Sequence, residues 1–249
     1  MIRIKTAPQI QAMREGGAML VTILALLRKE TKAGVTPKEL AAQARQELRK
    51  LGGEPAFLGY QGYPDVICIS VNSQVQHSIP TNKPLETGDI VNLDFGVKHK
   101  GMITDGGITF CVGENPTADQ QRLLQGTERA LLAALDVVKD GCRVGDISNA
   151  IEHVLKQHRL GIVRELVGHG VGYELHEDPE IPNYGSAGTG PVLREGMTIA
   201  IEPIANLGHE EIIGDRDGWT LWTADGSLSA QFEHTVLVTA SGCEVLTQA

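Results

Sequence analysis

Residues 91–105 are Val-Asn-Leu-Asp-Phe-Gly-Val-Lys-His-Lys-Gly-Met-Ile-Thr-Asp, two β-rich apolar runs on either side of His99-Lys100-Gly101. This pattern predicts a hairpin whose register depends on its turn. A two-residue turn at His99-Lys100 places Asp94 opposite Asp105, where like charges destabilise a sheet, so we expect a positive charge between them. A bulge at Gly101 would shift the register by one residue, and a second bulge would then be needed. Two solvated strand aspartates are the alternative without a cation.

The composition is that of a globular, acidic protein. The chain has 249 residues, 41% of them hydrophobic, and a formal net charge of −9. A chain of this size can bury a full core, as one large domain or as two fused halves. The acidic balance argues against binding to DNA or to an anionic membrane, because both require clustered Lys and Arg side chains.

The cysteines and the N-terminal sequence bear on the cellular compartment. The cysteines are scattered, without a Cys-x-x-Cys pair: Cys68, Cys111, Cys142 and Cys243. They indicate reduced thiols, and neither a zinc ribbon nor a disulfide framework. The N-terminal sequence does not resemble a signal peptide, and no uncharged run approaches the roughly 18 residues of a membrane span. We therefore expect a soluble cytoplasmic protein.

Helix start signals divide the rest of the chain. Thr6-Ala7-Pro8-Gln9 and Thr36-Pro37-Lys38-Glu39 have the form of capping boxes, and Gly52-Gly53 is a stop signal for the second predicted helix. Thr117 and Asp146 are expected to open a third and a fourth helix. Strands are predicted at 66–71, 90–98 and 102–112.

The second half of the chain repeats features of the first. A shift of 107 residues aligns Gly34, Leu40 and Leu48 with Gly141, Ile147 and Leu155, and a shift of 108 aligns Gly88 and Asp94 with Gly196 and Glu202. Both halves therefore read helix, helix, strands, carboxylate. We expect one domain over residues 1–249, with similar halves at 1–112 and 113–249 and a functional site between them.

The second half adds three candidate ligands to the two aspartates. They are His169 in Gly168-His169-Gly170, Glu202 in Ile201-Glu202-Pro203 and Glu233 in Phe232-Glu233-His234. Taken singly, each has an ordinary explanation as a loop histidine, a capping group or a solvated edge residue. Acidic residues in apolar strands are costly to bury unless they are paired or bind a cation. One imidazole and four carboxylates suit two divalent ions, whose charges they balance.

The motifs resemble those of type I methionine aminopeptidases of the bacterial, single-domain kind, over nearly the whole chain. The matching segments are Tyr60-Gln61-Gly62-Tyr63-Pro64, His77-Ser78-Ile79-Pro80, Asn92-Leu93-Asp94, Gly168-His169-Gly170-Val171-Gly172 with His176, Ile201-Glu202-Pro203, and Ser229-Ala230-Gln231-Phe232-Glu233-His234-Thr235. The resemblance implies an α+β protein with the pita-bread fold, in which two pseudo-symmetric halves surround a central dinuclear metal site.

The resemblance also implies a role for each ligand. Asp94 would chelate one metal ion, His169 and Glu202 would hold the other, and Asp105 and Glu233 would bridge the pair. Two such ions can hold a bridging water whose pKa falls toward about 7, and the resulting hydroxide would attack the first peptide bond. A bound hydroxide leaves a net negative charge, which favours a cationic group on the substrate.

Three residues are implied to handle protons and hydrogen bonds. Glu202 would act as the proton shuttle, His176 would hydrogen-bond the scissile amide and its tetrahedral intermediate, and His77 would place the following amide. The ordinary alternative for the two histidines is a satisfied loop position.

The family resemblance also implies a pocket for the methionine side chain. Its predicted lining residues are Phe57, Tyr60, Tyr63, Cys68, Leu175 and Trp219. Phe57 stands where the familiar bacterial enzymes tend to have a cysteine, and Leu175 where an aromatic residue is common. These differences conserve volume and change shape, so we expect methionine specificity and leave its strictness open.

The expected function is metal-dependent removal of the initiator methionine from nascent chains with a small second residue. Iron, manganese, cobalt and zinc all suit the ligands. We expect a monomer, with the ribosome as a candidate partner. We expect no counterpart of the extra domains and insertions that the resemblance associates with eukaryotic type I, type II and prolidase-like relatives. Alternatives are an aminopeptidase of altered specificity and a non-catalytic peptide-binding module, which would typically have lost metal ligands.

Two further departures from the family pattern lead to a prediction about metal retention. Gly106-Gly107 follows Asp105 where a small hydroxyl residue is frequent, and Ala200 stands where threonine is frequent. Loss of a hydrogen bond to a ligand typically costs roughly 10- to 100-fold in metal affinity or activity. We expect Ala200→Thr to lower the metal dissociation constant, measured by calorimetry. An unchanged constant would contradict this expectation.

Overall fold

The computed structural model describes residues 2–113 and 115–248. Within them the α-helices are α1 Ala7–Glu30, α2 Pro37–Leu51, α3 Ala118–Val137 and α4 Val144–Gln157, and a 3₁₀ helix covers Tyr60–Gly62. The strands are β1 Glu54–Pro55, β2 Cys68–Val71, β3 Gln74–Gln76, β4 Ile90–His99, β5 Met102–Cys111, β6 Gly161–Ile162, β7 Gly168–Gly170, β8 Glu177–Ile181, β9 Thr198–Ile201, β10 Ile204–Asn206, β11 Ile212–Gly214, β12 Leu221–Thr223, β13 Ser229–Gln231, β14 Glu233–Val238 and β15 Cys243–Val245.

Capping boxes start the first two helices where the sequence predicts them. At α2 the Glu39 carboxylate accepts the N–H of Thr36 at 2.8 Å, and the Thr36 hydroxyl accepts the N–H of Glu39 at 3.2 Å. At α1 the side-chain oxygen of Gln9 accepts the N–H of Thr6 at 2.9 Å. These bonds satisfy N–H groups that have no partner inside the helix. Gly52 then ends α2 in a left-handed conformation, with φ of 79°.

The second pair of helices agrees with prediction at one start and differs at the other. Thr117 caps α3, as expected, by accepting the N–H of Gln120. The predicted start at Asp146 is wrong, because α4 begins at Val144. The Asp146 carboxylate lies in the first turn and accepts the N–H of Arg143 at 2.8 Å. It satisfies the helix start from inside the helix.

β4 and β5 form the predicted hairpin in a different register. The two-residue turn lies at Lys100-Gly101, so Asp94 pairs with Gly107 and not with Asp105. Both turn residues have positive φ, 49° and 79°, as a type I′ turn requires, and glycine adopts this conformation without steric cost. Pairing continues to the turn without a bulge, so the bulge alternative at Gly101 is wrong as well.

Although the predicted register is wrong, both carboxylates lie on the same face of the hairpin, as predicted. Asp94 lies opposite Gly107, two residues beyond its predicted partner Asp105. Side chains alternate between faces with a period of two, so a shift of two residues turns neither carboxylate over. Asp94 and Asp105 are therefore diagonal neighbours, whose separation of about 7–8 Å is larger than that of a direct pair.

The two faces of β4 have different tasks. Its apolar residues pack with α1 and α2: Val91, Leu93, Phe95 and Val97. The residues between them, including Asp94 and Gly96, therefore face the opposite side of the sheet. Both Asp94 and the apolar residues are buried. One strand thus anchors the sheet to its helices and presents a carboxylate on the other face.

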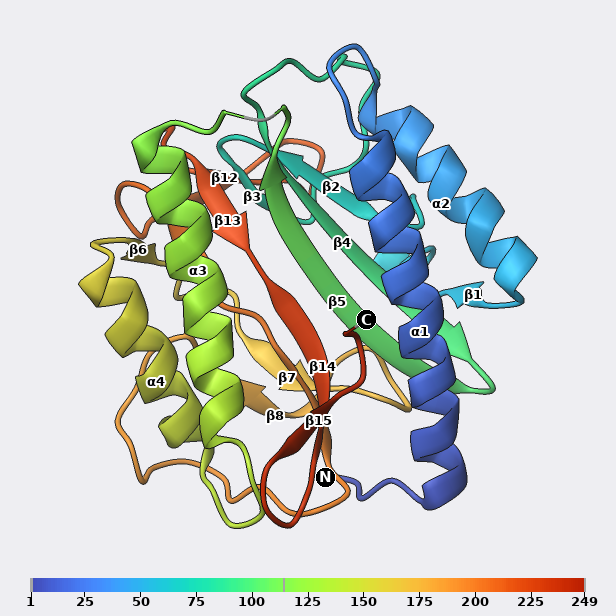
Figure 1. Ribbon diagram of the computed structural model, residues 1–249, viewed down its shortest axis with the longest axis vertical. Helices are drawn as coiled ribbons and strands as arrows, with labels where there is room; N and C mark the ends of the chain where they lie inside the picture. Colours follow the sequence, from blue (N-terminus) through green and yellow to red (C-terminus); the bar gives the residue numbers. More distant parts are fainter. Residues whose placement is uncertain (1, 114, 249) are drawn as a thin grey trace.

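The main sheet has the order β1-β4-β5-β14-β9-β7-β8, with β2 paired to β4 and β15 paired to β14. Figure 1 shows α1 and α2 on one side of the molecule, and α3 and α4 on the other, with β5 and β14 between them. Segments from both halves of the chain therefore meet along the β5–β14 pairing, where Glu233 lies opposite Gly107. The predicted division at residues 1–112 and 113–249 remains a prediction.

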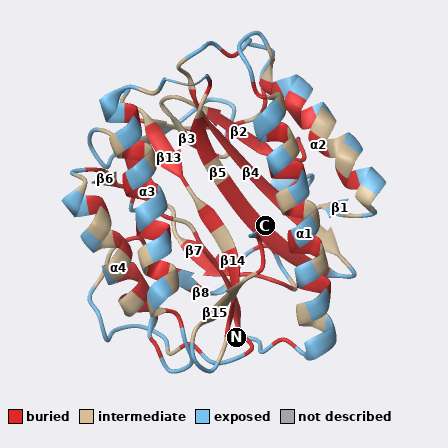
Figure 2. Ribbon diagram, viewed as in Figure 1, coloured by how far each residue is buried: buried red, intermediate tan, exposed pale blue. Residues whose placement is uncertain are grey.

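Two small sheets extend the structure, with orders β13-β10-β6 and β11-β12-β3. Figure 2 shows that the central strands are buried along most of their length, whereas the helices alternate between buried and exposed faces. One apolar core lies under α1 and α2 and another under α3 and α4. The helices therefore cover the sheet through amphipathic faces.

α1 is long and apolar enough to span a membrane by length and composition alone. Its inward face is buried, with Leu20, Ile23 and Leu27 at 0% exposure, and it packs on β4 and β5. A helix that covers a sheet in this way needs the same apolar composition. α1 is a core helix of this fold.

We expect Gly17→Ala to destabilise the protein, although replacing glycine with alanine stabilises an exposed helix position by up to about 1 kcal/mol. A β-carbon at position 17 would overlap the carbonyl oxygen of Leu246, and such overpacking costs about 1–3 kcal/mol. Gly16→Ala is the matched control, because its closest new contact is the Thr104 hydroxyl at 3.2 Å. Urea unfolding measures both variants, and equal midpoints would contradict the expectation.

Candidate metal and substrate site

One row of paired residues crosses the sheet and carries the first carboxylates. Cys68 of β2 pairs with Asp94 of β4, which pairs with Gly107 of β5, which in turn pairs with Glu233 of β14. Residues in such a row point to the same face. Asp94 and Glu233 therefore flank a position without a side chain, and both are buried, at 6% and 3% exposure.

Asp105 lies beside this row, opposite Gly96 of β4. Its backbone is fixed to β14 by Thr235, whose hydroxyl accepts the N–H of Asp105 at 2.9 Å and donates to its carbonyl at 2.7 Å. Its own carboxylate accepts the N–H of Gly106 at 3.0 Å. Asp105 is 3% exposed, and contacts with β4 on one side and β14 on the other fix its backbone.

His169 and Glu202 complete the set from the strands on the other side of β14. His169 pairs with Ala200 of β9, and Glu202 follows directly after that strand. The His169 Nδ1–H donates to the carbonyl of Gly170 at 2.9 Å, which leaves Nε2 unprotonated and 3.5 Å from Glu202 Oε1. A ligating histidine typically has this arrangement, in which one nitrogen donates and the other is free to bind a metal ion.

Two side-chain amides that were not assigned from the sequence support Glu233. Gln231 Nε2 donates to Glu233 Oε2 at 2.8 Å, and Asn92 Nδ2 donates to Gln231 Oε1 at 2.8 Å. A β-carbon at Gly107 would overlap the Gln231 amide. The only advance signal was that Asn92 and Gln231 belong to the quoted motifs. The missing side chain at Gly107 gives the amide its place.

Burial dominates the electrostatics of the carboxylates. It raises the pKa of Asp105 to about 7 and, together with the neighbouring carboxylates, raises the pKa values of Asp94, Glu202 and Glu233 well above their usual range. Among the described residues that line this site there is no Lys or Arg. The positive charge expected between the aspartates therefore does not come from a side chain.

The donor set fits divalent metal ions. Asp105, His169 and Glu233 offer ligand atoms that lie within 4.8 Å of one another. Asp94 Oδ1 and Glu233 Oε1 are buried without a hydrogen-bond partner, although buried polar atoms are normally satisfied. Carboxylate oxygens and an imidazole nitrogen suit manganese, iron, cobalt or zinc. A bound cation would satisfy both the unpaired oxygens and the excess negative charge.

His77 and His176 border the same site. Burial lowers the pKa of His77 to about 4 and also lowers the pKa of His176, so both rings are neutral at neutral pH. His176 Nδ1 is 2.8 Å from the Tyr60 hydroxyl, and its ring centroid is 4.3 Å from that of His169. Neutral rings can still donate one hydrogen bond each. Their positions are compatible with binding the amides of a peptide.

A single cavity of about 320 Å³ brings together every predicted site residue. The predicted ligands Asp94, Asp105, His169, Glu202 and Glu233 line it together with His77, His176, Phe57, Tyr60, Tyr63, Cys68, Leu175 and Trp219. Gln61, Gly218 and Leu221 also line it and were not assigned from the sequence. We call the part around the clustered ligand atoms of Asp105, His169 and Glu233 the charged end. The part lined by the residues of one apolar cluster, Phe57, Tyr60, Tyr63, Cys68, Leu175 and Trp219, is the apolar end. The roles of all these residues remain predictions.

Phe57 forms one wall of the apolar end through contact with β4. A β-carbon at Gly96 would lie 2.6 Å from Cε1 of Phe57 and 2.9 Å from Cδ1, so the ring occupies the space that a side chain at 96 would fill. Tyr63 and Trp219 also line the cavity and meet edge to face, with ring centroids 5.1 Å apart. The Tyr63 hydroxyl donates to the carbonyls of Ile67 and Ser78. These contacts define the shape of the apolar end.

The structure corrects the expectation about Gly106. A side chain there would point toward Leu20 of α1 and Thr247, on the face of β5 away from the carboxylates, because alternate residues face opposite sides. A hydroxyl at position 106 would not reach the ligands. Ala200 lies opposite His169 in the sheet and on its face, so the prediction for Ala200→Thr stands.

Comparison with known proteins gives the family. Residues 11–240 match metallopeptidase family M24, and the chain belongs to this family. Methionine aminopeptidase 1 of Bacillus subtilis is 41% identical over 248 residues, which cover 100% of both chains. The methionine aminopeptidase of Escherichia coli K12 is 42% identical over 248 residues, which cover 99% of this chain and 94% of the relative.

Solved structures agree with this assignment. The crystal structure of methionine aminopeptidase from Thermotoga maritima matches with a TM-score of 0.98 and 42% identity, over 100% of both chains. Prolidase from Pyrococcus furiosus matches with a TM-score of 0.80 and 25% identity, over 99% of this chain and 65% of the other. The predicted α+β pita-bread fold and the resemblance to methionine aminopeptidases are confirmed. These relatives give no support to the peptide-binding module.

We expect the metal-free protein to lose stability as pH rises from about 6.5 to 8.5. The pKa of Asp105 is about 7 in the folded protein, above its ordinary value of 3.8. The stability that protonated Asp105 contributes is therefore fully present below pH 3.8 and is lost as pH rises through 7. The pKa values of His169 and His77 are lowered, so their effect on stability falls below the pH range of this experiment. Thermal unfolding of chelator-treated protein measures this effect.

Two controls accompany this prediction. Asp105→Asn should weaken the pH dependence, because the variant lacks one of the buried carboxylates whose pKa is raised. Manganese should raise the melting temperature more at pH 8 than at pH 6.5, since metal and protons compete for the same oxygens. A metal-free melting temperature that rises across this pH range would contradict the expectation.

Proposed function

We propose that this protein is a metal-dependent aminopeptidase that removes the N-terminal methionine from nascent chains whose second residue is small. The observation that carries the proposal is the lining of one cavity, which combines five ligand-type side chains with a cluster of aromatic and aliphatic side chains. An exopeptidase needs both parts, because it must bind the first side chain and hydrolyse the bond next to it.

The metal ligands in this proposal are those of the charged end. Asp94 would hold one divalent ion, His169 and Glu202 would hold a second, and Asp105 and Glu233 would bridge them. The Gln231 amide supports this role of Glu233, since it fixes Oε2 and leaves Oε1 free. When bound, such ions supply a water molecule of lowered pKa and polarise a carbonyl. Which metal is used in the cell depends on availability as well as on affinity.

The remaining polar residues would manage the peptide and its protons. Glu202, whose pKa is raised by burial and by Asp94 and Asp105, would accept the proton from the attacking water and pass it to the leaving amine. The Tyr60 hydroxyl, donating to Nδ1 of His176, would keep the proton of that ring on Nε2. His176 could then donate to the carbonyl oxygen as charge develops on it. His77 would position the amide that follows.

The apolar end would bind the methionine side chain. Phe57, Leu175 and Trp219 line it, and an unbranched thioether adapts to irregular walls and makes favourable contacts with aromatic rings. The cationic amino terminus of the substrate would lie near the carboxylates, whose charge it complements. We place the enzyme in the cytoplasm as a monomer that acts on emerging polypeptides, with docking at the ribosome as a further part of the proposal.

The test is methionine release by the purified full chain from Met-Ala-Ser, Met-Leu-Ser and Leu-Ala-Ser, first metal-free and then with manganese, iron or cobalt. We expect metal-dependent cleavage of Met-Ala-Ser, at least about tenfold faster than that of the other two peptides, which is within the range of pocket discrimination. Equal cleavage of Leu-Ala-Ser would favour the altered-specificity alternative. No cleavage of any peptide by metal-loaded protein would overturn the proposal.

Asp105→Asn should lower methionine release by at least about 100-fold, because the variant loses a bridging ligand while keeping the shape of the side chain. Asp65→Asn is the matched control. Asp65 is also a buried aspartate, 3% exposed, but it pairs with Lys38 at 2.7 Å and Arg45 at 3.4 Å outside the cavity. It should lower stability and leave metal-dependent turnover largely intact. Full activity of Asp105→Asn would refute the assigned site.

A further inference from the structure

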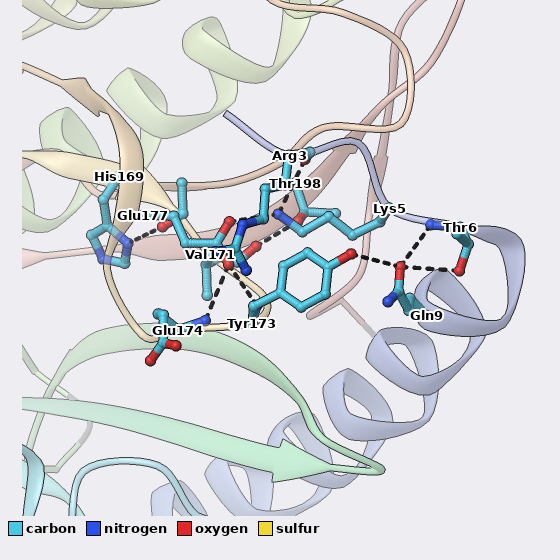
Figure 3. A network of polar contacts seen from close by, with 11 residues as sticks. Arg3, Lys5, Thr6, Gln9, His169, Val171, Tyr173, Glu174, Glu177 and Thr198 are labelled. Atoms are coloured by element: carbon cyan, nitrogen blue, oxygen red, sulfur yellow. Dashed lines mark hydrogen bonds and ion pairs between the residues drawn. The ribbon is translucent and has the colours of Figure 1, made fainter. Parts of the chain in front are cut away.

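A buried lysine, Lys5, lies close to the loop at residues 172–177, which carries His176. The Lys5 side chain is 2% exposed, and its Nζ lies 2.8 Å from Oε2 of Glu177, whose side chain is 9% exposed (Figure 3). Lys5 also joins the body of the protein through its backbone, since its N–H donates to the carbonyl of Gly196 at 2.9 Å. A buried charge is costly unless it is paired, and Glu177 supplies that partner.

The other oxygen of Glu177 organises the loop itself. Glu177 Oε1 accepts the backbone N–H groups of Tyr173 and Glu174, as the dashed lines in Figure 3 show. Glu177 is the first residue of β8 and pairs with Gly170 of β7. One carboxylate thus joins a strand, the loop before it and the segment that leads into α1.

Tyr173 makes a second connection between the loop and the start of α1. Its hydroxyl donates to Oε1 of Gln9 at 3.0 Å, and the same oxygen accepts the N–H of Thr6 in the capping box of α1. The guanidinium carbon of Arg3 lies 4.9 Å from the centre of the Tyr173 ring, within the range of a cation–π interaction. Residues 3–9 and the loop therefore form one polar network.

A glycine makes room for the lysine. Gly172 has a φ of +147°, and a β-carbon there would lie 2.5 Å from Cε of Lys5. Its carbonyl accepts the N–H of Ile103 in β5 at 2.7 Å. The loop is therefore fixed at its start by Gly172 and at its end by Glu177.

Between these two points the loop presents two side chains to the cavity. Leu175 is 4% exposed and packs at the apolar end, and His176 meets the Tyr60 hydroxyl and the ring of His169. Neither Lys5 nor Glu177 lines the cavity. The ion pair can therefore influence the reaction only indirectly, and the loop carries two side chains that connect it to the cavity.

We propose that the buried Lys5–Glu177 ion pair positions His176 and Leu175, so that Lys5 and Glu177 are positioning residues for substrate turnover. This inference rests on the proposed function for its kinetic consequence. Its structural consequence, an ordered loop at residues 172–177, does not depend on any activity. Displacement of His176 by about 1 Å would be enough to cost roughly 100-fold in rate.

The first experiment compares Lys5→Met, Glu177→Gln and the double variant with the native chain by hydrogen exchange and by methionine release. We expect Lys5→Met to speed exchange in peptides that cover residues 172–177 and to lower kcat roughly 10- to 100-fold. The double variant should recover part of both losses, because removing one partner leaves an uncompensated buried charge and removing both does not. Lys5→Arg should be closer to the native chain than Lys5→Met.

Arg14→Met is the matched control. Arg14 of α1 pairs with Glu244 of β15 at 2.6 Å. This variant therefore also removes an ion pair between α1 and a segment far away in the sequence, but one that is exposed and is not among the contacts of the loop described above. Exchange at 172–177 and kcat should stay within about twofold of the native values, as surface pairs contribute little. Equal effects of Arg14→Met and Lys5→Met would overturn the inference.

A double-mutant cycle separates positioning from general support of the fold. If Lys5 acts through His176, Lys5→Met should change kcat by less than about twofold in a His176→Ala background, whereas independent effects would multiply. Multiplying effects, unchanged exchange in the loop, or faster exchange throughout the chain would each overturn the inference. If the native chain releases no methionine the proposed function fails, and the exchange comparison still decides whether the ion pair orders the loop.

Discussion

The burial of like charges on one face of a sheet is the constraint on which this structure depends. Asp94, Asp105 and Glu233 are nearly inaccessible to solvent, and burial raises the pKa of each. No fold would gain stability from such a cluster alone. The surrounding protein therefore has to hold the carboxylates in place, by strand pairing on both sides, by the Thr235 bonds to Asp105 and by the Gln231 amide at Glu233. The result is a cluster of buried carboxylates whose negative charge a bound cation would offset.

The sheet meets this constraint through alternation. Along β4 the apolar residues face α1 and α2, while Asp94 and Gly96 face the cavity. Hydrophobic burial on the helix face therefore stabilises the strand that presents a costly carboxylate on the other. The pairing of β5 with β14 then brings Asp105 from the first half of the chain next to Glu233 from the second.

Much of this arrangement could be predicted from the sequence, where the signal was local. Thr6, Thr36 and Thr117 cap helices because their capping partners lie three residues away. The hairpin was recognised, but its turn was placed one residue early, because both His99-Lys100 and Lys100-Gly101 are possible turns. Only the positive φ at both Lys100 and Gly101 distinguishes them. The two-residue shift preserved the face, so the carboxylates were still assigned correctly to one side.

Contacts between distant segments were not predictable in this way. Lys5 and Glu177 are 172 residues apart, and nothing in either local sequence indicates the other. The same holds for Gln231 and Asn92, which are 139 residues apart. The thirteen predicted side chains around the cavity came largely from a family resemblance, which carries long-range information that composition and periodicity lack.

The contact between Phe57 and Gly96 has a consequence for protein engineering. The ring and a β-carbon at position 96 compete for the same space, so the two positions form a coupled pair in which one can grow only as the other shrinks. Changing either alone would move a wall of the cavity or leave a void. A smaller side chain at position 57 combined with a larger one at position 96 would reshape the apolar end without altering any of the predicted metal ligands.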